Sequence, residues 1–123
     1  MLRRLLLLLA ILAISLAAVA VASAGTQKKS TGLTGEVGPG FSIELKLAGK
    51  DLKTTKAGTY TIKVQDKSSI HDFHLIGPGV NKATTVPFTG TQTWTVKLKA
   101  GTYTYQCDPH AASGMKGTFK VTG

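Results

Sequence analysis

After residue 40, apolar residues alternate with polar ones in short runs that glycine-containing turns separate. Such runs cover residues 41–47, 60–64, 71–76, 84–88, 91–98, 102–107 and 117–121. A period of two places successive side chains on opposite faces of a β-strand. No segment after residue 24 repeats its apolar residues every 3.6 positions, so a helix is limited to one or two turns. The pattern predicts an all-β fold, a Greek-key β-sandwich of about seven to eight strands.

A short internal repeat supports this fold class. Residues 56–61 read KAGTYT, and residues 99–104 read KAGTYT again. In both copies a glycine turn leads into a strand, and the alternation points Tyr60 and Tyr103 inward. Two related corner-and-strand units in one small domain are typical of a Greek-key sandwich.

The first residues resemble an export signal. Arg3 and Arg4 precede an apolar run over residues 5–21, and residues 22–24 read ASA, the small-x-small pattern of a signal peptidase site. We therefore expect residues 1–24 to be a cleaved signal peptide and the protein to be exported to the periplasm, cell envelope or extracellular space. The apolar run is about as long as the shortest membrane spans, so an uncleaved membrane anchor is the alternative.

Removal of the signal leaves 99 residues, which is enough for one small domain. Residues 25–40 are rich in Gly, Ser, Thr and Lys and are predicted to be a flexible leader. Residues 41–123 are predicted to be the folded domain. We expect a monomer.

The mature chain is basic. Arg3 and Arg4 are the only arginines, so thirteen lysines face six acidic residues and the net charge is +7. This balance favours an acidic protein partner or, peripherally, an anionic membrane surface. Nucleic acid is not expected as a partner, because the mature chain has no arginine and no array of stacking aromatics.

Three residues with metal-binding side chains lie close together near the C-terminus. Cys107 is the only cysteine, His110 follows three residues later, and Met115 five residues after that. A single cysteine forms no intramolecular disulfide. An exported protein seldom keeps a free thiol without a use, because the thiol would oxidise or cross-link. In isolation Cys107 could equally be a buried apolar residue. The alternation points it inward, and Pro109 with the small residues after it allows a tight loop that brings Met115 back.

A fourth ligand has to come from another segment, and the other histidines are His71 and His74. The alternation places His71 on the same face as Phe73 and Leu75, which favours His71. His74 remains the alternative.

The ligand types distinguish between metals. A structural zinc site requires four closed Cys or His ligands, and this chain has one cysteine and a thioether that zinc rarely uses. Copper accepts two imidazoles, a thiolate and a weak axial thioether, and it cycles between Cu(I) and Cu(II) in that shell. One copper ion per chain is predicted, with one-electron chemistry.

The motif Cys107-x2-His110-x4-Met115, with Gly101-x-Tyr103-x-Tyr105 before it and Gly117 after it, is similar to that of the plastocyanin and amicyanin group of blue copper proteins, the cupredoxins. The segment 71–75, HDFHL, resembles the histidine element of the same family, and the resemblance covers residues 41–121. It implies a type 1 copper site at one end of the sandwich. His71, Cys107 and His110 would form the ligand plane, with Met115 as the axial ligand.

The resemblance also implies electron transfer to redox protein partners through the exposed edge of His110. We expect the docking partner to present an acidic surface. The chain departs from the family pattern in three ways: Asp72 replaces the usual asparagine, Gln106 replaces the tyrosine of photosynthetic plastocyanins, and the acidic patches of those plastocyanins are missing. A photosynthetic role therefore does not follow.

Two other functions fit parts of the sequence. One is a periplasmic or cell-envelope protein that binds or delivers copper, although such proteins use exposed Met and His clusters. The other is a metal-free β-sandwich adhesion domain, for which Cys107 would be dispensable. The sequence shows no activated nucleophile, no paired carboxylates and no open coordination position, so we do not expect an enzyme.

Overall fold

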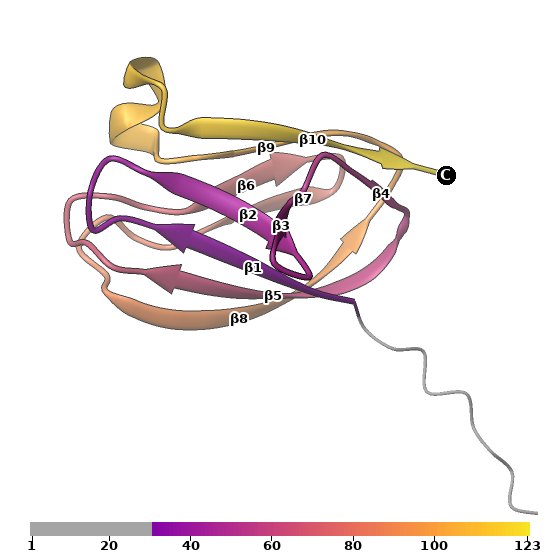
Figure 1. Ribbon diagram of the computed structural model, residues 1–123, viewed down its shortest axis with the longest axis horizontal. Coiled ribbons are helices and arrows are strands. Elements are labelled where there is room, and N and C mark those ends of the chain that lie inside the picture. The colour runs from indigo at the N-terminus through magenta and orange to yellow at the C-terminus, as the bar shows by residue number, and fades with distance from the viewer. Residues whose placement is uncertain (1–30) are drawn as a thin grey trace, which may run out of the picture.

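The structure, a computed structural model, describes residues 31–123, which form a two-layer β-sandwich with one short 3-10 helix (Figure 1). No helix in this part of the chain is long and apolar enough to cross a membrane. The strands, in chain order, are β1 (Thr31–Val37), β2 (Ile43–Leu47), β3 (Lys50–Asp51), β4 (Thr54–Lys56), β5 (Gly58–Asp66), β6 (His74–Gly77), β7 (Val80–Ala83), β8 (Gly90–Leu98), β9 (Gly101–Gln106) and β10 (Lys116–Thr122). The 3-10 helix η1 (Asp108–Ser113) lies between β9 and β10.

Each layer is a five-stranded sheet of mixed direction. The first sheet has the order β3-β2-β1-β5-β8, in which β1 and β5 run parallel. The second has the order β4-β10-β9-β6-β7, in which β10 and β4 run parallel. Within each sheet, strands that are far apart in sequence lie side by side, such as β5 and β8 or β10 and β4, as the long connections of a Greek-key sandwich require. The predicted all-β fold class is confirmed.

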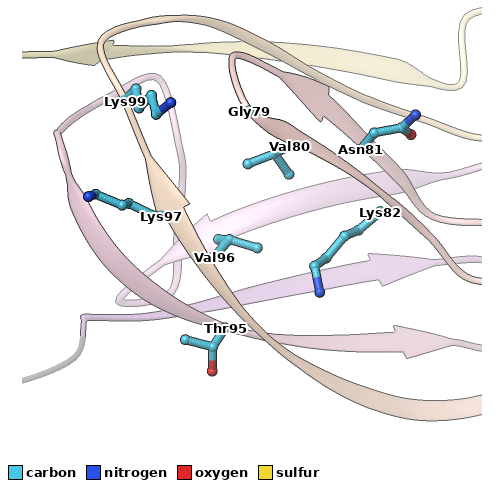
Figure 2. A pocket seen from close by; sticks show the side chains of 8 residues that line it. All are labelled: Gly79, Val80, Asn81, Lys82, Thr95, Val96, Lys97 and Lys99. Carbon is cyan, nitrogen blue, oxygen red and sulfur yellow. The ribbon is translucent and has the colours of Figure 1, made fainter.

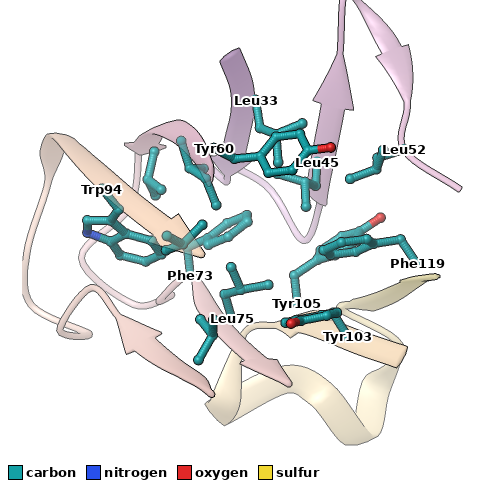
Figure 3. Close-up of a cluster of buried hydrophobic side chains, with 14 of the residues drawn as sticks. Leu33, Leu45, Leu52, Tyr60, Phe73, Leu75, Trp94, Tyr103, Tyr105 and Phe119 are labelled. Carbon is teal, nitrogen blue, oxygen red and sulfur yellow. The ribbon is translucent and has the colours of Figure 1, made fainter. Parts of the chain in front are cut away.

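The core fills the space between the two sheets (Figure 3). Phe73, Leu75, Tyr103 and Tyr105 are all buried, so the predicted inward faces of their segments are confirmed. The Tyr103 and Phe119 rings stack at a centroid distance of 5.2 Å, and the Phe73 and Tyr105 rings lie 6.0 Å apart. Burial of each such side chain contributes about 1.5–3 kcal/mol to the free energy of folding.

The repeated KAGTYT segments share a structural purpose. The Tyr60 hydroxyl donates a hydrogen bond to the Lys56 carbonyl at 2.6 Å, and the Tyr103 hydroxyl lies 3.1 Å from the Lys99 carbonyl. The Tyr103 hydroxyl also accepts a bond from the Lys99 N–H at 2.9 Å. Each tyrosine therefore fixes the turn four residues before it while its ring packs in the core, in the manner of the tyrosine corners of other β-sandwiches.

Three predictions about individual segments are wrong. Residues 31–37 of the predicted flexible leader form β1, because they gain a strand partner on each side, β2 and β5. Phe41 lies in the loop before β2 and is 70% exposed, although the alternation placed it on the inner face. Residues 84–88 form a turn, since the strand of this region, β7, ends at Ala83. The predicted signal at 1–24 and residues 25–30 of the leader lie outside the described residues.

Candidate metal centre

The loop after β9 folds back on itself and brings Met115 beside Cys107. The Cys107 N–H donates to the Met115 carbonyl at 3.0 Å, and the Met115 N–H donates to the His110 carbonyl at 3.2 Å. Between them Pro109 lies near the start of η1, and Gly114 ends it with φ at 98°, a left-handed conformation that glycine adopts without strain. The tight loop expected from these small residues is therefore present.

Three atoms of ligand type come together where this loop meets the segment before β6. The Cys107 Sγ lies 3.6 Å from the His71 Nδ1 and 3.5 Å from the His110 Nδ1. The two Nδ1 atoms are 3.0 Å apart, a hydrogen-bond distance at which one ring donates from its Nδ1–H and the other accepts. Cys107 and His71 are fully buried, whereas His110 is half-buried. Met115 is also buried, and its backbone is hydrogen-bonded to Cys107 and His110.

This donor set fits a copper ion. A metal bonds to imidazole nitrogen at about 2.0 Å and to thiolate sulfur at about 2.3 Å, so two such ligands in one trigonal shell lie roughly 3.7 Å apart. The observed nitrogen–sulfur distances of 3.5 and 3.6 Å are close to this value. A thiolate and two imidazoles with a buried thioether nearby match the preferences of copper better than those of zinc.

His71 is held by a buried hydrogen-bond network rather than by a strand, because β6 begins only at His74. The Asp66 carboxylate accepts bonds from the Ser68 N–H at 3.2 Å and from the Thr84 hydroxyl at 2.7 Å. The same Thr84 oxygen accepts a bond from the Phe73 N–H at 2.9 Å. Asp66 and Thr84 are each 2% exposed. This network fixes the two ends of the short segment that carries His71.

Asp72 connects that segment to the loop. Its Oδ1 accepts a bond from the Asp108 N–H at 2.6 Å, directly after Cys107. An aspartate at this position therefore still makes a hydrogen bond to the loop. Burial raises the pKa of the Asp72 carboxyl above its ordinary value, which the Asp108 amide only partly offsets.

The electrostatics favour a neutral Cys107 thiol before metal binds. Burial raises its pKa above the ordinary value, although the backbone amides of Asp72 and His110 act in the opposite direction. A metal ion must therefore displace the thiol proton when it binds here.

His74 lies outside this group. Its Nδ1 is 2.9 Å from the Asp108 carboxylate, and its Nε2 is 2.6 Å from the Asn81 side-chain oxygen. Burial disfavours the charged ring, but the bonds to Asn81 and Asp108 outweigh it and raise the pKa of His74. Both ring nitrogens of His74 are therefore engaged by residues other than His71, Cys107 and His110.

One contributor to the site was missed by the sequence analysis, and one that it named is explained by the structure. The Phe41 ring packs edge-on against the His71 and His110 rings, at centroid distances of 5.1 and 4.9 Å. No sequence signal places it there, because it reaches the site from a loop distant in sequence. Gly117 allows Tyr105 to pack close, since a Cβ at that position would lie 2.3 Å from the tyrosine ring. The glycine after the ligand motif is explained by that contact.

Comparisons with known proteins agree with this geometry. The chain matches the sequence model of the copper binding proteins, plastocyanin/azurin family, over residues 18–122. Among solved structures, reduced rusticyanin shares 24% identity with a TM-score of 0.54, over 74% of this chain and 78% of that chain. Rusticyanin from Thiobacillus ferrooxidans shares 26% identity with a TM-score of 0.50, over 74% and 76%.

Dithionite-reduced auracyanin from the photosynthetic bacterium Roseiflexus castenholzii shares 22% identity with a TM-score of 0.55, over 76% of this chain and 98% of that chain. A comparison with curated protein sequences gives no significant match. The family match covers most of the chain, and the structural matches extend over the sandwich.

Proposed function

We propose that this chain, which belongs to the plastocyanin/azurin family of copper-binding proteins, is an exported blue copper protein that carries single electrons between redox partners. Copper is its cofactor. The observation that carries the proposal is the convergence of one thiol and two imidazoles, whose ligand atoms all lie within 4.8 Å of one another.

The residues that would hold the copper are His71, Cys107 and His110, with the Met115 thioether as a fourth, weaker donor. When bound, copper supplies a one-electron couple between Cu(I) and Cu(II). The backbone bonds between Cys107, His110 and Met115 position three of these residues without the metal. Because the scaffold holds the donors in advance, they need to move little when the charge at the site changes, which favours fast electron transfer.

His110 is the proposed point of electron exit and entry. It is half-buried, whereas His71 and Cys107 have no exposed surface. Exposed Pro109 and Ala112 lie beside it in the loop, and the exposed Phe41 ring packs against it. This apolar surround allows a redox partner to approach the imidazole without trapping charged groups. The basic net charge favours a partner with an acidic surface.

The burial also weighs against copper delivery. A delivery site has to exchange its ion readily with an acceptor, yet two of the proposed ligands are fully enclosed. Slow copper release together with fast, reversible reduction is therefore expected. Rapid copper transfer to a chelator would favour the delivery function.

The decisive experiment adds Cu(II) to the purified protein and records its visible spectrum. We expect an intense blue band that dithionite abolishes, that Cys107→Ser eliminates, and that the exposed-loop control Ser113→Ala retains. A colourless wild-type protein would refute the proposed copper site.

Export is tested separately. We expect the protein to be recovered outside the cytoplasm with Gly25 as its N-terminal residue, as the predicted signal at residues 1–24 requires. Recovery of an intact N-terminus in the membrane fraction would favour the anchor instead.

A further inference from the structure

A basic groove lies between β7 and β8, which are edge strands of the two sheets (Figure 2). Its volume is about 400 Å³. Val80 and Val96 lie between Lys82 on one side and Lys97 and Lys99 on the other. Both valines are buried, at 8% and 3% exposure, so the groove has an apolar floor and a cationic rim.

The rim lysines have no carboxylate partner in the described chain. The ion pairs among residues 31–123 involve Lys46, Lys67 and His74, and none of the groove lysines. No acidic residue lines the groove. Three like charges around one depression repel one another, and a ligand that carries several carboxylates would relieve that repulsion.

The walls of the groove also offer backbone hydrogen-bonding groups. β8 pairs only with β5, and β7 pairs only with β6, so each strand has one free edge. β8 is nine residues long, which leaves a row of unpaired N–H and C=O groups. A free edge with an apolar floor and charged side chains at intervals is the arrangement by which sheets bind extended peptides.

The groove is separate from the copper-binding loop. In the β6–β7 hairpin, Val80 pairs with Gly77 at the turn, whereas Ala83 pairs with His74 at the end nearest the loop. Lys99 lies at the same turn, because a Cβ on Gly79 would be 3.5 Å from its Nζ. A ligand in the groove would therefore leave the exposed edge of His110 free.

We propose that this groove binds an extended acidic segment of a partner protein and so tethers the chain while His110 remains available for electron exchange. The free strand edges favour a polypeptide over a small anion, because only a polypeptide satisfies the backbone groups along their length. The apolar floor accepts its alternate side chains. Copper has no part in this binding.

The test uses the copper-loaded protein as it is purified and a fluorescent octapeptide of alternating Glu and Val. Fluorescence anisotropy measures its affinity for the wild type, for Lys82→Gln/Lys97→Gln/Lys99→Gln and for the control Lys50→Gln/Lys53→Gln/Lys63→Gln. Both variants lose the same net charge, and all six lysines are exposed. We expect the groove variant to bind at least about tenfold more weakly and the control less than about threefold.

Equal weakening in both variants would overturn the proposal in favour of unspecific attraction to net charge. Absence of peptide binding would also overturn it, and would leave the lysines as protection of the edge strands against aggregation. The copper-free protein should bind the peptide equally well, so this result is independent of the copper site.

A second measurement separates the polypeptide from other anions. Peptide N-methylated at alternate residues should lose most of its affinity, because methylation removes the backbone donors. Unchanged affinity together with displacement by inorganic tripolyphosphate would assign the groove to small polyanions. Lysine-dependent binding to phosphatidylglycerol vesicles, with no effect of N-methylation, would assign it to a membrane surface.

Discussion

Two clusters of ligand-type side chains are built from neighbouring residues of the same two segments. The inner cluster contains His71, Cys107 and His110, and the outer cluster contains Asp72, His74 and Asp108. In each, the potential ligand atoms lie within 4.8 Å of one another. Proximity alone therefore does not distinguish the two.

The difference lies in hydrogen bonding and burial. In the outer cluster His74 is bonded through both ring nitrogens, and Asp108 accepts bonds from His74 and from the Gln106 amide at 2.9 Å. In the inner cluster the His71 Nδ1, the His110 Nδ1 and the Cys107 sulfur face one another at 3.0 to 3.6 Å, and His71 and Cys107 are fully buried. The side chains of the outer cluster are hydrogen-bonded to one another and to their neighbours, whereas the inner cluster is the proposed copper site.

The largest expected contrast is between the two histidines of the HDFHL segment. We expect His71→Ala to abolish the blue band, because it removes a donor that lies 3.6 Å from the Cys107 sulfur. We expect His74→Ala to retain the band, since its ring points to Asp108 and Asn81. Visible spectroscopy after Cu(II) addition measures both. Loss of the band in both variants, in folded protein, would mean that the clusters are not functionally separate.

The next prediction concerns the support of the inner cluster. Thr84→Val removes a hydroxyl that serves Phe73 and Asp66, and leaves two buried polar groups without that partner. We expect a loss of about 2–3 kcal/mol in the free energy of unfolding, together with weaker copper retention. Urea titration and competition with a chelator measure these effects.

Thr85→Val in the same turn is the matched control, because Thr85 is exposed. Its stability should change by less than about 0.5 kcal/mol. Equal losses in the two threonine variants would contradict the role assigned to the buried network.

Asp72 joins the clusters, so its charge tests how strongly they interact. In Asp72→Asn the amide oxygen still accepts the bond from the Asp108 N–H, but a buried negative charge beside Cys107 is removed. Oxidised copper carries one more positive charge than reduced copper, so a nearby negative charge stabilises the oxidised form more. Removing the Asp72 charge should therefore raise the reduction potential. Voltammetry of wild type and variant at pH 7 measures the shift, and a lower potential in Asp72→Asn would refute this reasoning.

The smallest effect belongs to the outer cluster. The native pKa of His74 is raised above the ordinary value of 6.5. The ion pair with Asp108 therefore makes its full contribution to stability at a pH below 6.5. This contribution is lost as the pH rises through the raised native pKa. We expect His74→Gln to lose about 0.5 kcal/mol at pH 5.5, and less at pH 9. A deficit that grew with pH would contradict this sign.

Much of the fold follows from the sequence, because strand periodicity is local. The alternation correctly placed Phe73, Leu75, Tyr103 and Cys107 toward the core. It failed for Phe41, which the alternation placed on the inner face but whose ring is exposed and packs against the His71 and His110 rings. It also failed for β1, since a Gly- and Thr-containing stretch becomes a strand only when β2 and β5 lie on either side of it.

The fold class and the proximity of Cys107, His110 and Met115 could be predicted from the sequence alone, because strand periodicity is local and these three residues share one loop. Tertiary structure decided how the distant segment before β6 meets that loop. The contact depends on the packing of the second sheet, on the Asp66 and Thr84 bonds, and on the bond from Asp108 to Asp72. These bonds join residues 18 and 36 positions apart. The alternation favours His71 over His74 as the inward residue, but a local period carries no information about which distant loop that residue meets.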